Sequence, residues 1–94
     1  MEEKIKAISD LLHEAGETHH IVYKIVDGED KDWASWYSEW LLTLSKLAEI
    51  LGTSPVKSEL TYMLVKLDKE YTTNKPQDKW EDYYAKKLLE YFTH

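Results

Sequence analysis

The sequence predicts an all-α protein: one domain over residues 1–94, folded as an up-down four-helix bundle. Two observations predict it. Four segments place apolar residues three or four positions apart, which is the spacing of one face of an α-helix. Short breaks separate these segments at residues 27–32, 52–54 and 72–76, and short connections favour antiparallel neighbours.

The first helix is expected from about Glu2 to Val26, which makes it the long helix of the bundle. Gly16 lies inside it and costs about 1 kcal/mol relative to alanine. An alternative ends this helix at Gly16 and leaves three helices plus an irregular segment over 17–32, because residues 21–26 are rich in β-branched side chains. The helix is favoured, since the chain offers no partner strand. Its apolar stripe comprises Ile8, Leu12, Ala15, His19, Val22 and Val26.

A turn over Asp27–Asp32 precedes the second helix, which is expected over Trp33–Leu51. Asp30 or Asp32 would cap this helix at its N-terminus, and Gly52 is a natural stop. Its expected apolar face is built from Trp33, Tyr37, Trp40, Leu44, Leu47 and Leu51.

The last two helices are marked by proline. Ser54 is expected to cap the third helix, with Pro55 at its first position, and Pro76 is expected to start the fourth. The third helix would bury Val56, Leu60, Met63, Leu64, Leu67 and Tyr71; the fourth would bury Trp80, Tyr84, Leu88 and Tyr91.

Composition excludes several function classes. The chain has no cysteine, which excludes disulfides, thiolate metal sites and a cysteine nucleophile. Its net charge is −6 and it has no arginine, so nucleic acid is a poor partner. No stretch approaches the roughly 18 apolar residues of a membrane span, and the N-terminus does not resemble a signal peptide. We therefore expect a cytoplasmic protein without nucleic-acid or membrane partners.

The histidines of the first helix raise the question of a metal site. His13, Glu17 and His20 share one helix face, and Glu17 and His20 have the Glu-x-x-His spacing of di-metal bundles. His19 lies on the apolar stripe, either as a core histidine or as an inner ligand. A full di-metal site takes two such motifs, and the chain has one. Structural histidines without a cofactor are favoured; a divalent metal held by His13, Glu17, His19 and His20 is the alternative.

Large aromatic side chains are concentrated at the start of the second helix, at Trp33, Trp36, Tyr37 and Trp40. Their helical spacing favours core filling. The alternative is an aromatic-lined groove for an apolar or cationic ligand, with Glu39 as the counter-charge.

Four apolar residues fall on otherwise polar helix faces: Leu42, Tyr62, Val65 and Leu89. If they converge in space, they form an interaction patch. No catalytic constellation accompanies them. The sequence therefore predicts a small non-enzymatic protein-interaction module, binding a protein partner or itself as a homodimer. The alternative is a metal- or small-ligand-binding bundle that uses the first helix's histidines and the aromatic cluster over 33–40.

Overall fold

The computed structural model describes residues 2–26 and 32–93, and it is all-α over that part of the chain. Five helices follow one another: α1 (Glu2–Val26), α2 (Trp33–Thr43), α3 (Leu47–Leu51), α4 (Lys57–Asn74) and α5 (Trp80–Phe92). The predicted helical class and the long first helix are therefore confirmed, and residues 17–26 continue α1. The residues 27–31 of the predicted turn lie outside the described residues.

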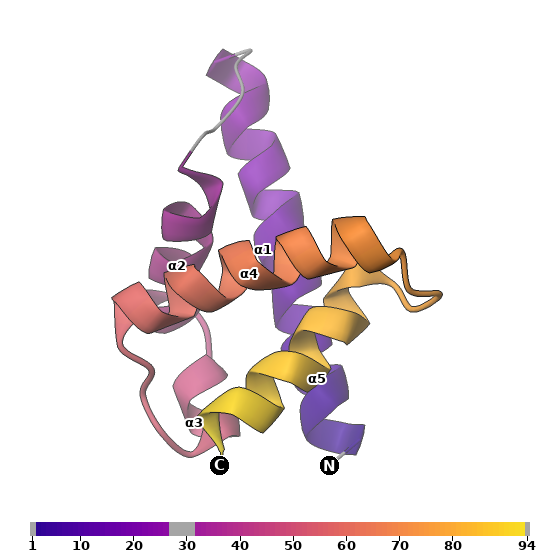
Figure 1. Ribbon diagram of the computed structural model, residues 1–94. Coiled ribbons are helices and arrows are strands. Elements are labelled where there is room, and N and C mark those ends of the chain that lie inside the picture. The colour runs from indigo at the N-terminus through magenta and orange to yellow at the C-terminus, as the bar shows by residue number, and fades with distance from the viewer. Residues whose placement is uncertain (1, 27–31, 94) are drawn as a thin grey trace.

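The helices pack in two main pairs. α5 lies along the N-terminal half of α1, and α4 packs against α2 (Figure 1). α4 runs across α1 and α2 instead of parallel to them, while the last turns of α1 extend beyond the other helices (Figure 1). The described termini lie near each other at one end of the molecule.

One contiguous core joins the helices. Ile8 and Leu12 of α1 are fully buried and lie in the same cluster as residues of α2 to α5. The other buried apolar members are Ala34, Leu41, Leu47, Leu51, Leu60, Met63, Leu64, Leu67, Tyr84, Ala85, Leu88 and Leu89. Truncating one fully buried leucine to alanine costs about 2–5 kcal/mol, so this cluster accounts for a large part of the stability of so small a domain.

The predicted single helix over Trp33–Leu51 is wrong, because the chain breaks at Leu44–Lys46. Two hydroxyl groups compete with the helix here. Thr43 donates to the Glu39 carbonyl at 2.5 Å, and Ser45 donates to the Leu41 carbonyl at 2.5 Å. Ser45 Oγ also accepts the Leu47 N–H at 3.2 Å, which satisfies a backbone donor at the start of α3.

This break changes which residues are buried. Leu44 was expected in the core and is 72% exposed, whereas Leu41 is fully buried. Leu42 was expected to be exposed, yet it is partly buried against the core. The buried residues of α2 are Ala34, Ser38 and Leu41, so its buried face is shifted by one position from the predicted one.

Smaller differences occur at the helix ends. α4 begins at Lys57 with Val56 as its N-cap, two residues after the predicted Ser54–Pro55 start. α5 begins at Trp80 instead of Pro76. α3 ends as predicted at Gly52, whose φ of 77° is a left-handed conformation that glycine adopts without steric cost.

Other stripe residues are more exposed than predicted. Val22 is 44% exposed, Val56 59% and Tyr91 45%. Val22 is near the C-terminal end of α1, and the last turns of this helix extend beyond the other helices (Figure 1). The side chain of Val26 lies outside the described residues.

Candidate functional site

The N-terminal part of α2 supplies the first wall of an aromatic pocket. Trp33 and Tyr37 are four residues apart on this helix, so they point in the same direction. Their ring centroids lie 5.8 Å apart in an edge-to-face arrangement. Both side chains are partly buried against the core and both line the pocket.

Two other helices complete the pocket. Trp80 and Tyr84 lie four residues apart in the first turns of α5, and Tyr71 lies in the last turns of α4. Together with Trp33, Tyr37 and Asp68 they line a pocket of about 330 Å³. Its volume is at the lower end of the range for small-ligand sites, so it suits a small ligand or a single side chain.

The five rings follow one another around the pocket. Beyond Trp33 and Tyr37, the centroids of Tyr37 and Trp80 are 6.5 Å apart, those of Trp80 and Tyr84 are 5.2 Å apart, and those of Tyr84 and Tyr71 are 6.3 Å apart. The planes of each pair are inclined by 69° to 88°. Neighbouring rings therefore face different directions around the pocket.

Asp68 is the carboxylate among the described residues that line this pocket. Its Oδ1 accepts the phenolic O–H of Tyr84 at 3.3 Å. Burial and the Asp68 carboxylate raise the pKa of Tyr84, and burial together with the charge of Glu81 raises the pKa of Tyr37. Both phenols therefore stay neutral at physiological pH, and Asp68 supplies the negative charge.

The structure brings together only part of the predicted aromatic groove. Of its five residues, Trp33 and Tyr37 line the pocket, whereas Trp36, Trp40 and Glu39 do not belong to its described lining. Trp36 packs against His19, with centroids 5.0 Å apart. Glu39 is exposed, and its Oε2 lies 3.1 Å from Lys57 Nζ; the carboxylate that lines the pocket is that of Asp68.

Sequence reasoning missed Asp68, Tyr71, Trp80 and Tyr84 as site residues, because it assigned the three aromatics to the core. One signal was available. Tyr71 and Trp80 flank the short connection between α4 and α5, so the sequence places them close together. Tyr71 also donates its O–H to the carbonyl of Asp78 in that connection at 2.7 Å, which fixes its ring at the pocket.

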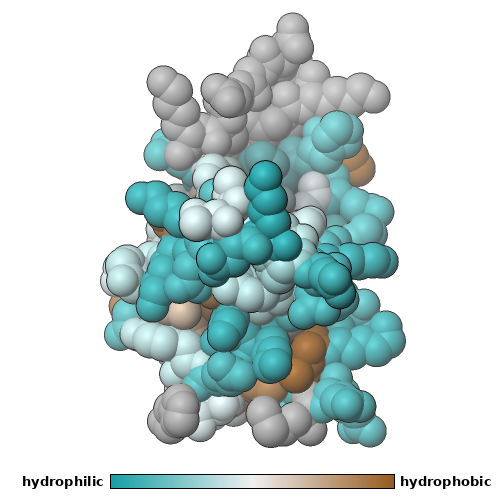
Figure 2. All heavy atoms as spheres, turned by 45° about the vertical axis from the view of Figure 1, so that its right-hand side comes forward, coloured by the Kyte–Doolittle hydropathy of each residue, from teal (hydrophilic) through white to brown (hydrophobic). Residues whose placement is uncertain are grey.

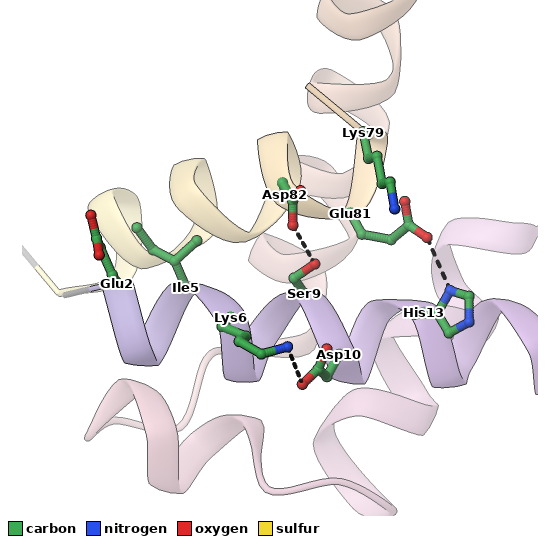
Figure 3. Close-up of a pocket in the computed structure, with 9 residues that line it drawn as sticks. All are labelled: Glu2, Ile5, Lys6, Ser9, Asp10, His13, Lys79, Glu81 and Asp82. Atoms are coloured by element: carbon green, nitrogen blue, oxygen red, sulfur yellow. Dashed lines mark hydrogen bonds and ion pairs between the residues drawn. The ribbon is translucent and has the colours of Figure 1, made fainter. Parts of the chain in front are cut away.

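The predicted metal ligands are only partly brought together. His13 Nε2 lies 3.0 Å from Glu17 Oε1. His13 Nδ1 lies 3.1 Å from Glu81 Oε2 (Figure 3). The hydrogen bond with Glu81 and then the charge of Glu17 raise the pKa of His13. Both ring nitrogens therefore face carboxylates, an arrangement that favours a protonated ring.

His19 does not join this group, because it lies beside the rings of Trp36 and Tyr37. His20 is exposed and lines a groove of about 530 Å³ together with His13, Glu17 and Glu81. Within residues 2–22 and 32–93, no three histidine or carboxylate side chains gather as a metal ion would require.

The predicted interface residues do not form one patch. Tyr62 is 62% exposed and Val65 is 37% exposed, as predicted, and they lie three residues apart on α4. Leu89 is only 2% exposed: its predicted exposure is wrong, because α5 packs this side of the helix into the core. The face in Figure 2 is mostly hydrophilic, with hydrophobic atoms in small separate areas.

Comparisons with models of protein families, with characterised proteins and with solved structures found no match for this chain. Among the described helices, none has the length and apolar character that crossing a membrane requires. The site is therefore interpreted from its own residues.

Proposed function

We propose that this chain is a non-enzymatic helical binding module whose aromatic pocket holds a cationic group of a partner or small ligand. The observation that carries the proposal is the convergence of five aromatic rings and one carboxylate from three helices on one pocket. Ring faces attract cations, and this attraction reaches about 2 kcal/mol where water is excluded. A nearby carboxylate adds a Coulomb attraction.

The charge of the chain supports a cationic ligand. The net charge is −6, which attracts cations over distances longer than direct contact. The pocket residues also lack the nucleophile–base pairing of a covalent catalyst, since Asp68 is bonded to a phenol and not to a histidine or serine. Binding, and not turnover, is the role that this chemistry supports.

A tryptophan fluorescence titration with tetramethylammonium chloride tests the proposal, with sodium chloride at equal ionic strength as the blank. We expect a saturable change for the parent chain. Trp33→Leu should weaken binding by about tenfold, because it removes one ring face and keeps apolar bulk. Trp40→Leu is the matched control: Trp40 is also a half-buried tryptophan of α2 and does not line the pocket. Equal effects of the two variants would refute the assignment.

A second function, self-association or protein binding through α4, is favoured by the exposure of Tyr62 and Val65. Sedimentation of the parent chain and of Tyr62→Ser tests it. We expect the parent to form a dimer at high concentration and the variant to stay monomeric. A parent chain that is monomeric at all concentrations and is not captured by any partner would contradict this second function.

A further inference from the structure

We infer that the cation for which the aromatic pocket is built is a quaternary ammonium group, in preference to a primary ammonium. This inference rests on the proposed function and adds the chemical class of the ligand. It follows from the kinds of atoms that the pocket offers, and from how its polar atoms are already bonded.

A primary ammonium needs hydrogen-bond acceptors. It carries three N–H donors, and burying a donor without a partner is costly. The described pocket lining offers one carboxylate, and Asp68 Oδ1 already accepts the Tyr84 O–H at 3.3 Å. The Tyr71 hydroxyl is directed to the Asp78 carbonyl. Asp68 can still accept through its other oxygen, but the rest of the described lining is aromatic. A primary ammonium that leaves water would therefore exchange part of its hydrogen bonds for ring contacts.

A quaternary ammonium has no N–H group. Its charge is distributed over methyl groups, and these can contact ring faces directly. Trp33, Tyr37 and Trp80 all line the pocket, and the planes of successive rings are inclined by 88° and 69°, so ring surfaces of different orientation border it. Asp68 offsets the charge without having to donate or accept a new hydrogen bond. The same arrangement of rings would hold an uncharged group less tightly, because only the charge interacts with Asp68.

Three probes with the same hydroxyethyl chain separate these effects. Choline carries the quaternary nitrogen, ethanolamine carries a primary ammonium, and the uncharged isostere of choline has carbon in place of nitrogen. Isothermal titration of the full chain with each probe should give choline an affinity at least about tenfold higher than either of the others. Ethanolamine binding as tightly as choline would overturn the inference while leaving the pocket a cation site. Isostere binding as tightly as choline would overturn the role of charge. Failure of all three would contradict the proposed function as well.

Matched variants connect the preference to the pocket. Asp68→Asn keeps the shape and an oxygen for Tyr84, so it should weaken choline binding several-fold and leave isostere binding unchanged. Glu59→Gln removes an equal charge from the same helix, outside the described lining, and should leave both unchanged. Equal losses of choline affinity in the two variants would mean that only the net charge of the chain matters, and would overturn the role of Asp68.

Two peptides identify the source of the quaternary group: one carries a lysine, and the other carries trimethyllysine at the same position. Tighter binding of the trimethyllysine peptide supports the inference and identifies a modified protein as the source. Choline binding without binding of either peptide also supports it and identifies a free small molecule. Tighter binding of the lysine peptide would overturn it.

Discussion

His13 of α1 contacts Glu81 of α5 and Glu17 of its own helix, and these two carboxylates determine how its charge affects stability. Its pKa is raised from the ordinary value of 6.5, first by the hydrogen bond with Glu81 and then by the charge of Glu17. A raised pKa in the folded state means that protonated His13 stabilises the fold. This contribution is complete below pH 6.5 and is lost as the pH rises through the folded-state pKa.

We therefore predict that NMR titration of the His13 ring gives a pKa above 6.5. Glu81→Gln and Glu17→Gln should each lower this pKa, because the hydrogen bond with Glu81 and the charge of Glu17 both raise it. Glu14→Gln, a neighbouring exposed residue of α1, is the control. A pKa at or below the ordinary value in the parent chain would refute the two contacts.

Gly16 lies beside two rings that line the aromatic pocket. A Cβ atom at this position would lie 3.4 Å from the Tyr37 hydroxyl and 3.6 Å from Trp80. These are ordinary contact distances, so alanine fits where larger side chains would displace both rings. The sequence alone showed the cost of this glycine but could not show its neighbours.

Gly16→Ala should accordingly raise the free energy of unfolding by about 0.5–1 kcal/mol, the helix-propensity difference between the two residues. Gly16→Leu should lower it, because its bulk meets Tyr37 and Trp80. Urea unfolding of both variants measures the two effects. A loss of stability for alanine would mean that the rings approach α1 more closely than described.

At the scale of helices, the apolar periodicity predicted which segments are helical better than it predicted where each helix begins and ends. It predicted α1 in full, and the buried positions Leu60, Met63, Leu64 and Leu67 of α4. It failed between α2 and α3, where the Ser45 hydroxyl donates to the Leu41 carbonyl and accepts the Leu47 N–H. An apolar spacing that continues across this break does not show that a serine hydroxyl bonds to the backbone there.

Two leucines of this region give opposite predictions. Leu41→Ala should cost about 2–5 kcal/mol, because Leu41 is fully buried. Leu44→Ala should change stability by less than about 0.5 kcal/mol, because its side chain is 72% exposed. Chemical denaturation of the pair checks this. A large loss of stability in Leu44→Ala would contradict the break between α2 and α3 and would favour the continuous helix that the sequence predicted.

At the scale of the whole molecule, the pocket depends on how three helices meet. Its lining extends from Trp33 to Tyr84 along the chain, and α4 crosses its neighbours instead of lying parallel to them (Figure 1). Helical periodicity assigns a face to each residue but not the angle between helices. For that reason the sequence predicted Trp33 and Tyr37 as groove residues, but it could not show that they lie together with Asp68, Tyr71, Trp80 and Tyr84.

The indole N–H groups of the four tryptophans provide the most direct test of the aromatic pocket. Proton–nitrogen NMR would follow them during a titration with tetramethylammonium chloride, against sodium chloride at equal ionic strength. Trp33 and Trp80 line the pocket, and their signals should shift saturably with one common dissociation constant. Trp36 and Trp40, outside the described lining, should shift much less. The absence of any saturable shift, or equal shifts of all four signals, would contradict the proposed binding site.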